Sequence, residues 1–189
     1  MDGTDARWLA EARRGEALAF RRLVEGQARP LHALCMRITR DAGMAEDAVQ
    51  EALYKAWRAL PDFDGRSAFS TWLHRIAANA ALEQLRRNAR HRHEETDGGE
   101  DDLALLDSVE AGAPEPEDHA ASGEIAARVD RQLARMSVME RTAFVLRHHE
   151  GESLEAISQA LGINIGQAKQ AVFRAVRKLR LALEPWRES

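Results

Sequence analysis

The side chains with the most readable chemistry lie near the C-terminus, between residues 165 and 183. Amide and basic residues recur there at helical spacing on one side: Gln167, Lys169, Gln170, Arg174, Arg177, Lys178 and Arg180. Amides suit hydrogen bonds to base edges, and cations suit phosphate oxygens. The pattern favours a nucleic-acid surface, although a basic helix that meets only solvent carries similar charges.

A second candidate surface follows two expected helices between residues 45 and 87. The first carries a polar ribbon at the helical period: Asp47, Gln50, Glu51, Tyr54 and Arg58. The second carries a mainly basic edge: Arg75, Asn79, Arg86 and Arg90. Both also have apolar faces at spacings of three and four, so each helix has one side for a core and another for a partner.

The segment PDFDGRSAFS joins these two helices. Pro61 and Gly65 interrupt helical structure, and the Ser67 hydroxyl is expected to cap the next helix. The segment is expected to expose Phe63 and Arg66. Periodicity leaves a second interpretation open, in which the loop is a plain connector and Phe63 fills the core.

These surfaces need elements to position them, and the apolar periodicity predicts an all-α chain. A helix is expected over 5–26, with Gly15 as a weak point or bend, and another begins at Pro30. Further on, a helix over 154–161 ends at Gly162, which suits a left-handed C-cap, and a long helix follows over 165–183. Helix, short turn and helix at this spacing predict a helix-turn-helix.

Length and composition favour two small helical domains. The 189 residues are 44% hydrophobic, which suffices for packed cores. The single cysteine, Cys35, cannot form an internal disulfide and is expected to pack as a small buried side chain, as in a reducing cytoplasm. No metal or cofactor site is predicted, because cysteine and histidine do not occur at ligand spacing. We expect no signal peptide and no direct membrane insertion, because no apolar run approaches about 20 residues.

Charge is distributed unevenly along the chain. Residues 91–122 hold 11 Asp and Glu against one Lys or Arg, whereas the segments on either side each carry a net charge of +3. The acidic stretch is rich in Gly and Pro and poor in aromatics, which predicts a flexible linker. Two basic modules around an acidic tether indicate modules that contact phosphate and a segment that avoids or mimics it.

Three segments together resemble the extracytoplasmic-function (ECF) group of bacterial sigma factors, compact members of the sigma-70 family built from region 2, a linker and region 4. They are AEDAVQEALYKAW, FDGRSAFSTWLHRIAANAALEQLRR and ERTAFVLRHHEGESLEAISQALGINIGQAKQAVFRAVRKLR. The resemblance implies region 2 over 1–90, a linker over 91–122 and a region 4 helix-turn-helix over 123–189. It implies a factor, not an enzyme, that directs core RNA polymerase to promoters, often under stress.

The resemblance also implies roles for individual residues of region 2. Four would face the clamp helices of the polymerase β′ subunit: Asp47, Gln50, Glu51 and Tyr54. Nine would contact the minus-ten element: Phe63, Asp64, Arg66, Ser67, Trp72, Arg75, Asn79, Arg86 and Arg87. There the loop would capture an extruded base, because stacking and hydrogen bonds offset the few kcal/mol that unpairing costs.

Region 4 would read the minus-thirty-five element and meet the β flap of the polymerase. The implied residues are Gly166, Gln167, Lys169, Gln170, Arg174, Arg177 and Lys178. The chain departs from the usual family pattern at Met136-Ser137, at Ala156-Ile157-Ser158 and over 166–171, where Ala171 removes an expected cation. We therefore predict an atypical minus-thirty-five element or a weaker dependence on it.

Two other classes of protein compete with this interpretation. An autonomous helix-turn-helix regulator would explain the C-terminal part but not the ribbon at Asp47 or the loop at Phe63. An enzyme is the weakest candidate, because no grouping of nucleophile, base and orienting residue is readable. The family resemblance further implies an anti-sigma factor as a partner.

Overall fold

The structure is a computed structural model that describes residues 3–94 and 123–184, and every regular element in these ranges is a helix. The helices are α1 (Gly3–Arg13), α2 (Ala17–Glu25), α3 (Ala28–Thr39), α4 (Ala42–Ala59), the 3₁₀ helix η1 (Leu60–Asp62), α5 (Phe69–Glu94), α7 (Gly123–Ala134), α8 (Val138–His148), α9 (Leu154–Leu161) and α10 (Ile165–Leu183). This confirms the predicted all-α class. The linker predicted over 91–122 lies outside the described residues from 95 onward.

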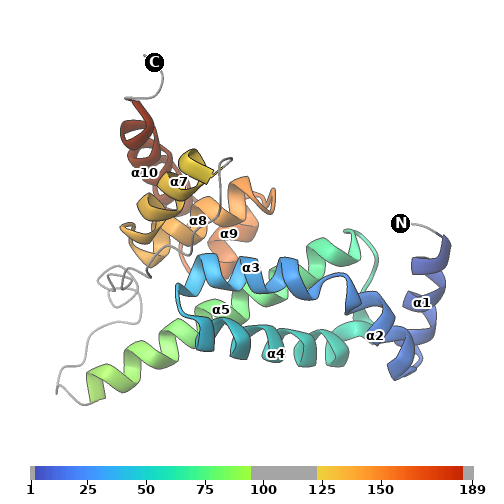
Figure 1. The fold of residues 1–189 in the computed structure, drawn as a ribbon. Coiled ribbons are helices and arrows are strands. Elements are labelled where there is room, and N and C mark those ends of the chain that lie inside the picture. Colours follow the sequence, from blue (N-terminus) through green and yellow to red (C-terminus); the bar gives the residue numbers. More distant parts are fainter. Residues whose placement is uncertain (1–2, 95–122, 185–189) are drawn as a thin grey trace.

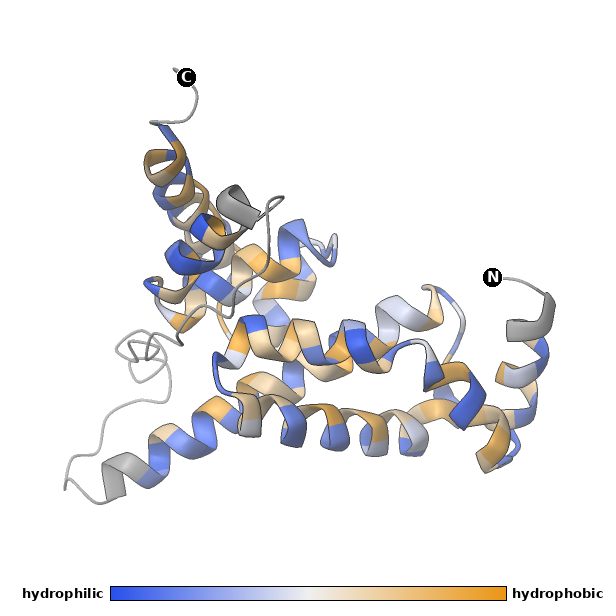
Figure 2. Ribbon diagram, in the orientation of Figure 1, coloured by the Kyte–Doolittle hydropathy of each residue, from blue (hydrophilic) through white to orange (hydrophobic). Residues whose placement is uncertain are grey.

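The N-terminal half, residues 3–94, is built around α3, α4 and α5, which lie side by side (Figure 1). Four alanines on α4, at positions 45, 48, 52 and 56, are fully buried, and such small residues let helices approach closely. Figure 2 shows that the outer edge of α4 is hydrophilic. The predicted helix over 5–26 is two helices, because Gly15 adopts a left-handed backbone with φ +95° between α1 and α2.

The single cysteine lies in the core of this half. Cys35 on α3 has no exposed surface, and its Sγ contacts the carbonyl oxygen of Ala77 on α5 at 3.8 Å. Burial raises the pKa of its thiol to about 12, so the thiolate is scarce at neutral pH. The predicted role as a small buried side chain is confirmed.

In the C-terminal half, residues 123–184, α9 and α10 form the predicted helix-turn-helix. Ser153 caps α9 by accepting from the backbone N–H of Ala156 at 3.1 Å, and Gly162 ends the helix with φ +71°. Ser137 caps α8 by accepting from the backbone N–H of Glu140 at 3.3 Å. Both serines therefore supply start signals for helices.

The two halves share one hydrophobic core. Buried residues of α8 and α9, such as Val145 and Ile157, belong to the same cluster as Leu34 and Leu73 of the N-terminal half. At their junction Arg141 of α8 is fully buried and donates to the carbonyl oxygen of Ile38, from Nη2 at 2.8 Å and from Nε at 3.1 Å. Ile38 lies in the last turn of α3, so Arg141 satisfies a helix-end carbonyl of the other half. The division into domains at 90 and 123 stays a prediction.

Candidate nucleic-acid and protein interfaces

The loop between α4 and α5 buries the aromatic ring of Phe63, which was expected to be exposed. Phe63 is only 4% exposed and packs against Phe69 and Trp72, with ring centroids 6.1 and 5.0 Å away. The expectation that the loop exposes Phe63 is therefore wrong, and the alternative, in which Phe63 fills the core, is confirmed. The Arg66 side chain is 89% exposed, as expected. The prediction that the Ser67 hydroxyl caps the next helix is wrong, because α5 starts at Phe69 and Ala68 directly precedes it.

Beside this loop lies a cavity of about 390 Å³. Six of the nine predicted minus-ten residues line it together with Asp62: Phe63, Asp64, Arg66, Ser67, Trp72 and Arg75. Asp64 accepts from the backbone N–H of Arg66 at 3.0 Å and from its guanidinium, and these bonds lower the pKa of the Asp64 carboxyl. The cavity thus combines aromatic rings with a carboxylate that stays ionised and an exposed cation.

The other predicted minus-ten residues lie along α5, and most are engaged elsewhere in the molecule. Arg86 donates to the carbonyl oxygen of Leu161 at 3.2 Å, and the cavity residue Arg75 donates to Glu152 at 3.4 Å. Arg87 donates to both carboxylate oxygens of Glu51 at 2.9 Å. Asn79 is exposed. Two arginines of the basic edge therefore contact the C-terminal half.

The polar ribbon on α4 is accessible over most of its length. Asp47 and Gln50 are exposed, and Tyr54 is 63% exposed although it is large and aromatic. Glu51 is less accessible, because it also accepts from Lys55 at 2.9 Å and from Gln84 at 3.3 Å. The ribbon thus presents an aromatic ring between polar groups, a composition common in protein interfaces.

The N-terminus of α10 is organised by one of its predicted base-reading residues. The Gln167 side chain accepts from the backbone N–H of Asn164 at 3.0 Å, while Asn164 accepts from the N–H of Gln167 at 2.9 Å. This reciprocal capping box occupies the Gln167 carbonyl oxygen. The expectation that Gln167 is free to read bases therefore needs correction: only its amide nitrogen has no partner among the described residues.

Two further positions on α10 correct the sequence analysis. Ala171 has no exposed surface, so its position faces the core and cannot hold the outward cation that we expected there. Phe173, which the analysis did not single out, is 64% exposed among exposed polar neighbours, including Lys169, Gln170 and Arg177. The sequence offered a signal for this residue, because a phenylalanine on the second helix of a helix-turn-helix can contact thymine methyl groups when it is exposed.

Cations on the outer side of α10 have different partners. Arg174 donates from Nε to Glu140 at 3.1 Å, and Lys178 donates to the other oxygen of Glu140 at 2.5 Å. Lys169 and Arg177 are exposed and have no carboxylate partner in the described part of the chain. The predicted contact residue Gly166 is also exposed.

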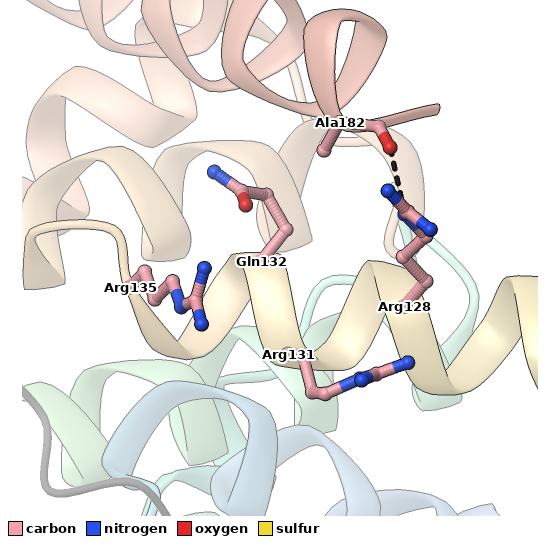
Figure 3. A pocket seen from close by; sticks show the side chains of 5 residues that line it. All are labelled: Arg128, Arg131, Gln132, Arg135 and Ala182. Carbon is pink, nitrogen blue, oxygen red and sulfur yellow. Dashed lines mark hydrogen bonds between the residues drawn. The ribbon is translucent and has the colours of Figure 1, made fainter. Parts of the chain in front are cut away.

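A second basic surface on α7 was also missed. Arg128, Arg131, Gln132 and Arg135 line a cavity of about 350 Å³, and Arg128 donates to the carbonyl oxygen of Ala182 at 2.7 Å (Figure 3). Arg131 extends from the other side of the helix, so the three guanidinium groups do not converge (Figure 3). Their spacing of three and four residues was the available signal.

Neither a metal-binding cluster nor a membrane-spanning helix occurs in residues 3–94 and 123–184. No cluster of three His, Cys, Asp or Glu side chains that could hold a metal ion occurs there. Across the same residues, none of the helices combines the length and the hydropathy of a membrane span.

Comparison with known proteins matches both halves. The model of sigma-70 region 2 matches residues 23–91, and that of sigma-70 region 4 matches residues 126–179. The RNA polymerase sigma-H factor of Pseudomonas aeruginosa is 34% identical, with 96% of this chain and 94% of that protein covered. The ECF RNA polymerase sigma-E factor of Escherichia coli is 30% identical, with 96% and 95% covered.

Two solved structures have a fold similar to that of this chain. The sigma factor RpoE from Bartonella quintana, in complex with the anti-sigma factor NepR, has a TM-score of 0.64 and 25% identity, covering 87% of this chain and 96% of its own. CnrH, in complex with the cytosolic domain of CnrY, has a TM-score of 0.57 and 26% identity, covering 96% and 98%.

The chain belongs to the ECF group of the sigma-70 family. It is a sigma factor, which directs RNA polymerase to promoter DNA, and sigma factors are not enzymes. Because the matches cover both halves, the autonomous helix-turn-helix regulator is not favoured. From here the N-terminal half is called region 2 and the C-terminal half region 4.

Proposed function

We propose that three surfaces divide the work of this sigma factor. The exposed ribbon of α4 docks on the clamp helices of core RNA polymerase, the cavity beside the α4–α5 loop holds an unpaired base of the minus-ten element, and the exposed face of α10 reads the minus-thirty-five element. The observation that supports this division best is the cavity, where Phe63 and Trp72 meet Asp64 and Arg66 in about 390 Å³.

The chemistry of the cavity suits capture of a base. Extruding a base costs a few kcal/mol, and stacking on an aromatic ring returns about 1–3 kcal/mol per base. Asp64 is a hydrogen-bond acceptor for exocyclic amines, and Arg66 supplies donors next to it. Base capture needs no covalent step, so neither a cofactor nor an activated nucleophile enters this proposal.

Binding of the DNA strand along α5 requires bonds to exchange. Arg75 and Arg86 donate to Glu152 and to the Leu161 carbonyl oxygen of region 4, and Arg87 donates to Glu51. Phosphate oxygens are stronger acceptors for guanidinium than a backbone carbonyl. We expect Arg86 to leave the Leu161 carbonyl oxygen, and Arg87 to leave the more accessible Glu51, when promoter DNA arrives.

The partners and location follow from the same proposal. One of the two solved structures of similar fold contains RpoE with the anti-sigma factor NepR, and the other contains CnrH with the cytosolic domain of CnrY. We infer that this chain also binds an anti-sigma factor. A factor that works on chromosomal promoters acts in the cytoplasm. The β flap of the polymerase is the proposed partner of region 4 away from the DNA-reading face.

The test is transcription in vitro with bacterial core polymerase and a genomic promoter library. The wild-type chain should initiate at defined sites, and Tyr54→Ala should reduce binding to core polymerase while the fold is kept, because Tyr54 is 63% exposed. Leu18→Ala is the matched control, since Leu18 is also exposed, at 77%, but on α2. Failure of the wild type to initiate anywhere contradicts the proposal.

A further inference from the structure

The carboxylate of Glu140 occupies an unusual place beside the DNA-reading helix. Glu140 lies in the first turn of α8, which runs along α10 (Figure 1), and the residue is only 4% exposed. One of its carboxylate oxygens accepts from Arg174 at 3.1 Å and the other from Lys178 at 2.5 Å. Arg174 and Lys178 are one helical turn apart on α10.

Burial makes this contact obligatory for the carboxylate but not for the cations. A buried carboxylate needs charged or hydrogen-bonding partners, because desolvation without them is costly. The side chains of Arg174 and Lys178 remain 46% and 45% exposed. Arg174 binds Glu140 through Nε, and its two terminal nitrogens have no partner among the described residues, so the planar guanidinium can still donate to two oxygens of a phosphate.

We propose that Glu140 is a positioning residue for recognition of the minus-thirty-five element. Glu140 fixes the direction in which the side chains of Arg174 and Lys178 point, and it offsets part of their charge. The two cations then bind DNA phosphates best when the DNA lies in one register, and they bind phosphates in other positions less well. This inference rests on the proposed function of α10. It distinguishes these two cations from Lys169 and Arg177, which no carboxylate holds within the described residues.

Two substitutions separate the charge of Glu140 from its geometry. Glu140→Gln removes the charge and nearly keeps the shape, whereas Glu140→Asp keeps the charge and shortens the reach. Each full-length variant is reconstituted with core polymerase and titrated, over a range of salt, with two promoters that share a minus-ten element. One promoter carries the minus-thirty-five element selected by the wild type, and the other a scrambled one.

Both variants should lower the preference for the selected element, by roughly tenfold, because the cations lose their fixed direction. Only Glu140→Gln should steepen the dependence of log K on log salt, by about one, because it leaves one more unbalanced cation. Glu25→Gln is the matched control, since it removes a carboxylate from an exposed ion pair with Arg22 on α2. This control should change neither quantity.

Two outcomes would contradict the role of Glu140 or the role of α10. Variants that match the wild type in both preference and salt dependence overturn the inference about Glu140. A wild type without preference between the two promoters contradicts the proposed function of α10 instead. Thermal melts check folding, and Glu140→Asp, which keeps the buried charge, provides the test if Glu140→Gln unfolds. Combining Glu140→Asp with Arg174→Gln and Lys178→Gln should give no further loss of preference beyond that of the cation variants.

Discussion

Region 2 and region 4 both pair cations that we propose to contact DNA with carboxylates, but they do so at different depths. In region 2, Glu51 and Glu83 share Lys55 and Arg87 in a network whose side chains are 21–44% exposed. In region 4, the Glu140 side chain is 6% exposed and holds both of its cations alone. Exposed pairs contribute little and exchange partners easily, whereas a buried carboxylate cannot lose its partners without a large penalty.

This difference suits the different tasks of the two regions. In the proposed function, region 2 meets polymerase through α4 and a melting DNA strand through α5. Glu51 belongs to the first of these proposed surfaces and Arg87, which donates to it, to the second. An exchangeable bond between them allows both surfaces to change partners. Region 4 reads duplex DNA, for which a fixed direction of the side chains matters more than exchange.

The largest effect is expected where region 4 enters region 2. Arg141→Ala leaves the carbonyl oxygens of Ile38 and Met136 without their buried donors and removes a large buried side chain. We expect the free energy of unfolding to fall by about 3 kcal/mol, measured by urea unfolding.

The control for this change lies on the same helix. Arg147 is exposed and donates to the carbonyl oxygen of Glu152 within region 4, so Arg147→Ala should lower the free energy of unfolding by less than about 1 kcal/mol. Burial lowers the pKa of Arg141 to about 10, which leaves its guanidinium charged at neutral pH. If Arg141→Ala and Arg147→Ala lowered the free energy of unfolding equally, the buried contact between the two halves would contribute nothing extra to stability.

The next effect concerns the cavity beside the α4–α5 loop of region 2, which is lined by aromatic rings. Trp72→Ala removes one aromatic wall, and stacking of about 1–3 kcal/mol corresponds to roughly a 5- to 150-fold loss of open complexes. Fluorescence of 2-aminopurine placed in the minus-ten element of a reconstituted promoter complex measures the opening. Trp57→Ala is the matched control, because Trp57 packs on Phe20 at 5.1 Å and does not line the cavity. Equal opening by both variants would contradict base capture there.

Local signals in the sequence were sufficient for the elements that bear these surfaces. The bounds of α9 and α10 were predicted because Ser153 and Gly162 supply a start and a stop whose geometry is decided within a few residues. The exposed positions of Asp47, Gln50 and Tyr54 also followed from the period of α4.

Contacts between distant residues could not be predicted in the same way. Arg141 and Ile38 are 103 residues apart, and no periodicity relates them. Phe63 was ambiguous because a loop has no period that assigns a side to its ring. Gln167 was assigned to bases because its outward position suits that role, and the sequence does not indicate that its side chain turns back to the backbone of Asn164.

A smaller effect should distinguish the two kinds of cation on α10. Arg177→Gln removes an exposed cation without a carboxylate partner among the described residues, so the slope of log K against log salt for promoter binding should fall by about one. Arg174→Gln should lower the slope less, because Glu140 already offsets the charge of Arg174. Equal changes in slope would mean that burial of Glu140 has no bearing on DNA binding, and the contrast between the regions would then be confined to stability.

The smallest effect is expected in the exposed network of region 2. The hydrogen bond from Lys55, followed by that from Arg87, holds the pKa of Glu83 below its usual value. A lowered carboxyl pKa stabilises the folded state above the unfolded pKa, and this contribution disappears as pH falls through the folded value. Glu83→Gln should therefore cost only a few tenths of a kcal/mol at neutral pH, and nothing once the pH has fallen below the lowered folded pKa of Glu83 or in high salt. Urea unfolding at several pH values measures this, and a loss comparable to that of Arg141→Ala would mean that the network is as rigid as the buried contacts of region 4.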